Sequence, residues 1–66
     1  MSFDIEIATT IQKYLYEVKG EQLGIEEILT RPRWKRVWIW WQALEHFEGK
    51  PKPALTVEEV KVIYGD

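Results

Sequence analysis

The fold of this chain is decided by residues 31–48, which read RPRWKRVWIWWQALEHFE. Pro32 suits the first turn of a helix, because the N–H that proline lacks would have no partner there. Gly49 follows as a terminator, since glycine readily takes the left-handed conformation that closes a helix. We therefore expect a helix from Pro32 to Glu48, the longest element of the chain.

The four tryptophans of this helix divide into two groups on a helical wheel. Trp34, Trp38 and Trp41 share one side, whereas Trp40 lies on an adjoining apolar face and Ile39 falls on the polar side. A domain of 66 residues has little room for four indoles, each of which hides on the order of 150 to 250 Å² when buried. We expect Trp40 in the core and Trp38 and Trp41 as exposed anchors.

Three shorter helices are predicted outside this segment. Apolar residues recur at spacings of three and four over residues 4–19, and Gly20 supplies a stop. Residues 22–30 form a short second helix. Thr56 and Glu59 make a capping box that opens a helix over 57–64. The apolar residues of this last helix that we expect to dock against the tryptophan helix are Val57, Val60, Ile63 and Tyr64.

These elements predict an all-α fold: a small three- to four-helix domain, residues 1–66, built around the Trp-rich helix. The alternative is an α+β fold, because Phe3, Ile5 and Ile7 alternate with polar residues and residues 2–8 therefore also fit a short strand. Its mate in a two-stranded ribbon from the termini would be the strand formed by Val60, Val62 and Tyr64.

Composition narrows the class of protein. Cysteine is absent, which excludes a disulfide framework and a thiolate zinc site, and a cytoplasmic location is the natural expectation. The start of the chain is acidic rather than basic and apolar, unlike a signal peptide. The longest apolar run is the five residues Val37–Trp41, against roughly 20 for a transmembrane helix. The sequence predicts a soluble protein.

The net charge of -2 conceals a segregation of charge along the chain. Residues 1–30 carry six acidic residues and two lysines, whereas residues 31–52 carry six cations and two glutamates. Four of those cations crowd into the first turn of the tryptophan helix, where the helix dipole disfavours positive charge. They are Arg31, Arg33, Lys35 and Arg36. An anionic partner would offset this local penalty.

Catalytic chemistry is not indicated. The chain has one serine, Ser2, and one histidine, His46, whose helical neighbours Gln42 and Lys50 complete no metal pair. The four glycines are scattered, so no phosphate-binding loop is present. We predict a non-enzymatic protein without cofactor or metal.

Exposed tryptophan beside arginine is typical of protein interface hot spots. The leading hypothesis is a small protein-binding module, an adaptor, inhibitor or assembly factor, that binds another protein or itself. Its predicted partner-binding residues are Trp34, Trp38, Trp41, Arg33 and Arg36.

The alternative partner is a nucleic acid, with phosphates bound by Arg31, Arg33, Lys35 and Arg36 at the helix N-terminus. A sequence pI of about 5.4 argues against it, because nucleic-acid-binding domains are typically basic. A membrane surface is disfavoured, since a helix lying on lipid keeps a clean polar face and this one carries Ile39 there.

Overall fold

The computed structural model describes residues 3–65 of the chain, and within them every regular element is a helix. Helix α3 (Arg33–Glu48) is the longest. Pro32 precedes it in an extended conformation, with φ -56° and ψ 148°, and Gly49 closes it at φ 69°. The predicted helix is therefore found from Arg33 to Glu48, and the placement of Pro32 in its first turn was wrong by one residue, because Pro32 stands at the N-cap position.

The N-terminal helix consists of two parts. Helix α1 (Phe3–Tyr14) continues without a break into η1 (Leu15–Lys19), a single widened π-helical turn. Gly20, at φ 67°, ends the pair by donating its N–H to the carbonyl groups of the last turn. The predicted helix over residues 4–19 is confirmed, but the widening of its last turn was not predicted.

No strand occurs between residues 3 and 65, so the predicted ribbon from the termini is wrong over that range. Phe3, Ile5 and Ile7 lie in α1, and Val60, Val62 and Tyr64 lie in the last helix. Residue 2 of the proposed strand lies outside the described residues. The alternating pattern near the start therefore reflects a helix with an apolar face only partly covered.

Helix α2 (Ile25–Leu29) is shorter than the predicted 22–30. Gly24 stands before it in an extended conformation, with φ -74° and ψ 157°, and offers no side chain to cap the helix. The preceding segment is held instead by Gln12 of α1, whose side-chain amide donates to the Leu23 carbonyl at 2.9 Å. The second helix therefore begins only at Ile25.

Helix α4 (Val57–Tyr64) forms where the capping box predicted it. The Glu59 N–H donates to Thr56 Oγ1 at 3.2 Å, and the Thr56 N–H donates to Glu59 Oε1 at 3.0 Å. Residues 49–56, hereafter the connector, contain neither helix nor strand. This agrees with the two prolines in the segment, which disfavour both helix and sheet.

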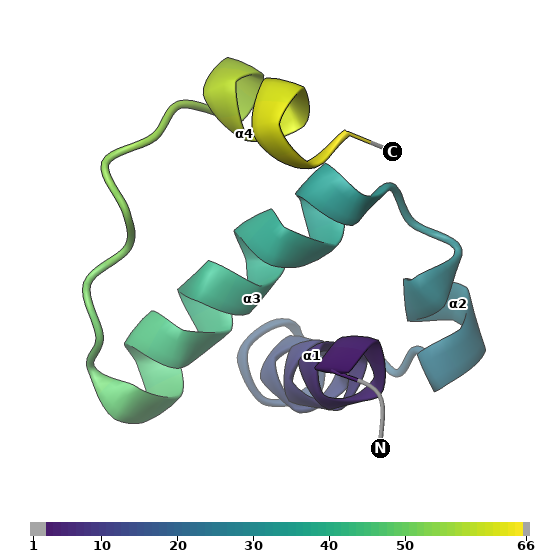
Figure 1. Ribbon diagram of the computed structural model, residues 1–66. Helices are drawn as coiled ribbons and strands as arrows, with labels where there is room; N and C mark the ends of the chain where they lie inside the picture. The colour runs from purple at the N-terminus through teal and green to yellow at the C-terminus, as the bar shows by residue number, and fades with distance from the viewer. Residues whose placement is uncertain (1–2, 66) are drawn as a thin grey trace.

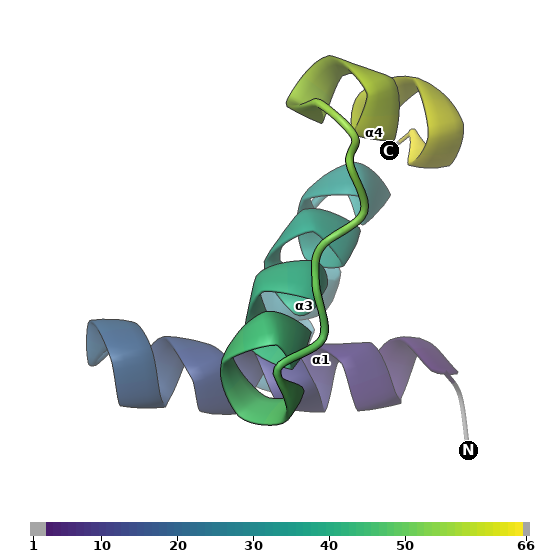
Figure 2. The same cartoon turned by 90° about the vertical axis from the view of Figure 1, so that its left-hand side faces the viewer.

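Helix α3 contacts a different helix on each of two sides. Helix α1 crosses it towards its C-terminal half, and α4 lies across its N-terminal end (Figure 1). The connector runs back along α3 to reach α4, which is plain in the perpendicular view (Figure 2). None of the described helices is long and apolar enough to cross a membrane.

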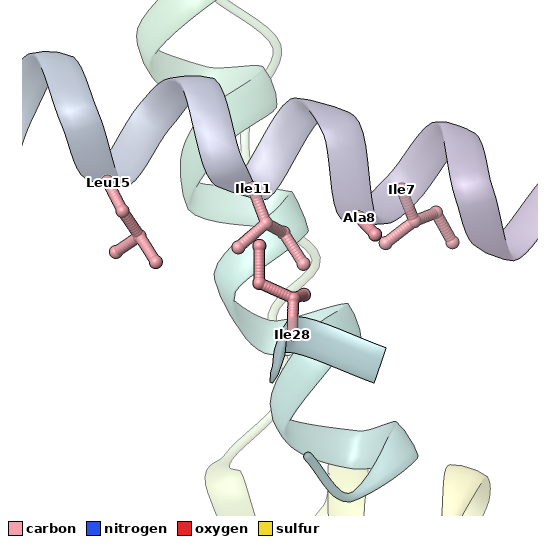
Figure 3. Close-up of a cluster of buried hydrophobic side chains, with 5 residues drawn as sticks. All are labelled: Ile7, Ala8, Ile11, Leu15 and Ile28. Atoms are coloured by element: carbon pink, nitrogen blue, oxygen red, sulfur yellow. The ribbon is translucent and has the colours of Figure 1, made fainter. Parts of the chain in front are cut away.

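The main core lies between α1, α2 and α3. Its buried members are three residues of α1, one of η1 and one of α2, and Ile28 of α2 points at Ile11 (Figure 3). The set is Ile7, Ala8, Ile11, Leu15 and Ile28. Trp40 and Ile39 of α3 pack against this cluster. The placement of Ile39 on a polar side was wrong, because Ile39 is half-buried and packs against the cluster that α1 and α2 form.

A second buried group lies on α3 and α4. Val60 of α4 is 0% exposed, and Val37 and Ala43 of α3 are also buried. Of the four residues predicted to dock α4, Val60 is buried, Val57 is half-buried and Tyr64 packs on Trp41 although it is 38% exposed, whereas Ile63 is exposed. The prediction was wrong for Ile63, because α4 touches one neighbour and buries only a narrow stripe.

The packing predicts unequal costs for two isoleucines. Ile11→Ala removes a side chain that is 1% exposed, and we expect a loss of about 2 to 5 kcal/mol in the free energy of unfolding. Ile63→Ala, at a side chain 59% exposed, should change it by less than about 0.5 kcal/mol. Urea titration followed by circular dichroism measures both, and equal losses would contradict this assignment of core and surface.

Candidate functional site

Trp40 lies on the α1 side of α3, as predicted for the tryptophan nearest the core. Its ring is half-buried and meets the ring of Phe3 edge to face, with centroids 5.4 Å apart. Edge-to-face contacts of this kind add to the stabilisation that burial alone gives. Trp40 therefore fastens the first turn of α1 onto α3.

The other three tryptophans share one side of α3, as the helical wheel predicted, but that side is covered. The Tyr64 ring of α4 packs edge to face on Trp41, with centroids 6.0 Å apart. The Lys61 ammonium lies 4.7 Å from the Trp34 ring centroid, and Lys52 of the connector lies 5.2 Å from that of Trp38.

The prediction that Trp38 and Trp41 are exposed anchors is therefore wrong, since both are half-buried. The physical reason is the return of the chain: α4 lies across the N-terminal end of α3, where Tyr64 and Lys61 contact Trp41 and Trp34, and Lys52 of the connector contacts Trp38. A wheel of one helix cannot show that an element later in the sequence covers it.

The N-terminus of α3 and the C-terminus of α4 are tied by a backbone hydrogen bond. The Trp34 N–H donates to the Gly65 carbonyl at 2.9 Å. This satisfies one of the N–H groups that a helix start leaves without a partner. It also removes that group from the phosphate-binding arrangement that the sequence predicted.

The structure divides the four basic residues of this segment between two hollows, and Arg31, Lys35 and Arg36 together line one of about 170 Å³. Arg31, Arg33 and Lys35 are exposed, whereas Arg36 is half-buried. Arg36 Nε is buried and has no hydrogen-bond partner among residues 3–65. Arg33 and Arg36 line a cleft that Arg31 and Lys35 do not reach.

This cleft, of about 290 Å³, opens where the first turn of α1, the first half of α3 and the end of α4 meet. Rings from all three helices line it, together with two arginines and one carboxylate over an apolar floor. The aromatic residues are Phe3, Trp40 and Tyr64, the charged residues are Asp4, Arg33 and Arg36, and the floor is Ile7 and Val37. We call it the Arg-aromatic cleft.

Sequence reasoning identified the arginines of this cleft but missed Phe3, Asp4 and Tyr64. Phe3 is 60% exposed and Tyr64 is 38% exposed, although both are large and aromatic. They come from opposite ends of the chain, and no local pattern indicates that the two ends meet over α3. Their aromatic character near the termini was the one signal available.

Metal and cofactor chemistry find no obvious place in the described region. Within residues 3–65, no group of three or more histidine, aspartate or glutamate side chains is arranged to hold a metal ion. His46 is exposed, and its ring lies against Tyr14 and Phe47, with centroids 5.7 Å and 5.0 Å away.

Comparison of the chain with models of known protein families, with curated proteins and with solved structures found no match. Function is therefore argued from the residues of the cleft and its surroundings.

The contacts of Trp41 predict a structural role. We expect Trp41→Ala to lower the free energy of unfolding by about 2 kcal/mol, less than the 3 to 5 kcal/mol of a fully buried tryptophan. The α4 amides should lose protection from hydrogen exchange more than those of α1, since Tyr64 loses its partner. Unchanged α4 protection would show that Trp41 does not hold that helix.

Proposed function

We propose that this protein is a small, non-enzymatic protein-binding module, an adaptor, inhibitor or assembly factor, organised around the Trp-rich helix α3. Its binding site is the Arg-aromatic cleft, and its partner is a protein segment that carries carboxylates beside apolar side chains. A cytoplasmic location suits a chain without cysteine.

The observation that carries the proposal is the composition of the cleft. Aromatic rings and arginine are the residue types enriched at interface hot spots, where a partner side chain fills a pocket and charges orient it. Here Phe3 and Tyr64 leave much of their rings exposed beside Arg33. An apolar side chain on these rings, with a carboxylate at the Arg33 guanidinium, would use both parts.

The roles of the predicted residues change with this assignment. Arg33 and Arg36 remain as the charges that orient the partner, and Trp40 supplies the aromatic wall. Trp34 and Trp41 support the site indirectly, because they contact α4 and thereby hold Tyr64 in place, whereas Trp38 contacts Lys52 of the connector.

A nucleic-acid partner fits the surroundings of the tryptophans less well. Stacking of unpaired bases needs an open ring face, but lysines lie over Trp34 and Trp38 and Tyr64 meets Trp41. These features favour a protein segment over a nucleic acid.

We expect Arg33→Glu to weaken binding of the partner at least about tenfold, since it replaces an attraction with a repulsion. Lys19→Glu is the matched control, because it makes the same change of charge at another exposed cation, at the far end of η1. A nuclease-treated pull-down from the native host compares wild type and both variants, and the captured protein is then titrated as a purified partner.

Two outcomes would contradict the proposal. Equal loss of the captured protein in both variants would show that net charge, not the cleft, decides binding. Binding of oligonucleotides with an affinity that falls steeply as salt rises would instead support the nucleic-acid alternative, because phosphate contacts release counterions.

A further inference from the structure

The outward side of α4 carries an exposed apolar pair that the fold does not use. Val62 is 86% exposed and lies on the side of the helix opposite the buried Val60, and Ile63 is 59% exposed on the flank between them. Both are β-branched aliphatic residues on a short surface helix.

Carboxylates accompany this pair in a regular arrangement. Glu58 lies one turn before Val62, and Glu59 lies one turn before Ile63, so each carboxylate stands beside an apolar residue on the helix surface. These four residues together line a shallow surface hollow. We call this surface the α4 ridge.

The α4 ridge has the chemistry that the proposed function requires of a partner, namely carboxylates beside apolar side chains. We propose that the segment bound by the Arg-aromatic cleft is the α4 ridge of a second copy of this chain. This inference rests on the proposed function. Val62 and Ile63 pack on the rings of Phe3 and Tyr64 of the second copy, and Glu58 lies at its Arg33.

Charge favours a dimer in which the ridge of one copy meets the cleft of the other over a dimer in which two ridges meet. If two α4 ridges packed on each other, Glu58 and Glu59 of both copies would meet, and like charges at an interface are repelled. When the ridge instead meets the cleft, a carboxylate faces an exposed guanidinium. The contact then combines apolar burial with opposite charge.

The positions of the two surfaces allow both contacts to form in one dimer. Tyr64 lines the cleft and is the last residue of α4, and the four ridge residues lie on the same helix, so the ridge and the cleft are neighbours along α4. A two-fold axis beside that end places each ridge at the cleft of the other copy, and the pair is closed. The contact is small, and interfaces below about 1,200 Å² are typically weak.

Sedimentation equilibrium from about 10 µM to about 1 mM, the range in which weak pairs dissociate, tests the dimer. We expect the wild type to dimerise and Val62→Asp to weaken the dimer at least about tenfold. Val18→Asp is the matched control, because Val18 is an exposed valine, 46% exposed, in η1. Circular dichroism confirms that both variants remain folded.

A charge swap identifies which surfaces meet. Glu58→Arg and Arg33→Glu each place like charges at both contacts of a dimer, so each variant alone should be monomeric. In an equimolar mixture, the arginine on one ridge faces the glutamate in the other cleft, and the second contact keeps its native pair. The mixture should therefore recover dimerisation to within about threefold of wild type, since two opposite-charge contacts are restored.

Three results would overturn the inference: a wild type that stays monomeric throughout, equal effects of Val62→Asp and Val18→Asp, or no recovery in the mixture. A synthetic peptide that alternates glutamate with leucine separates this failure from that of the proposed function. If the wild type is monomeric but the peptide shifts the Trp40 indole N–H signal in NMR, the inference is wrong and the cleft still binds acidic apolar segments. If neither occurs, both are wrong.

Discussion

The structure depends on one constraint: the tryptophans of α3 lie on two of its sides, so α3 must be covered on both. Trp40 contacts α1. Helix α4 and the connector contact the other three tryptophans, Trp34, Trp38 and Trp41. A chain of this length buries only about 60% of the surface that its unfolded form exposes, so large aromatic contacts are a substantial part of its stability. Helices α1 and α4 are held by opposite sides of α3.

Helix α4 packs against α3 with fewer buried side chains than are found on the α1 side of α3. On the α1 side, five buried residues form a continuous cluster, whereas α4 contributes one fully buried side chain, Val60. The docking of α4 and the connector on α3 is completed by lysine side chains, the Tyr64 ring and one backbone hydrogen bond. A short helix held in this way leaves its outer side free of neighbours within the fold, which is why Val62 and Ile63 remain exposed.

Local signals predicted the elements well. Gly20, Gly49 and the pair Thr56 with Glu59 fixed three helix boundaries, because caps and terminators act within one turn of the chain. The wheel also placed three tryptophans together on one side of α3. It did not predict what lies over them, since the return of the connector depends on contacts between residues far apart in sequence.

The same limit applies to the candidate site. Arg33 and Arg36 were predicted, because their crowding at a helix N-terminus is visible in the sequence. Phe3 and Tyr64 were not, because they join the arginines only when both ends of the chain fold onto α3. Neither η1 nor the exposure of Ile63 had a local signal.

The most direct measurement of the central claim is a NOESY spectrum of the aromatic protons. The account predicts cross-peaks between the Trp41 indole and the Tyr64 ring, and between the Trp40 indole and the Phe3 ring. These two contacts lie on different sides of α3 and hold different helices. A Trp40 to Phe3 cross-peak without one between Trp41 and Tyr64 would contradict the claim, because α3 would then be covered on one side alone.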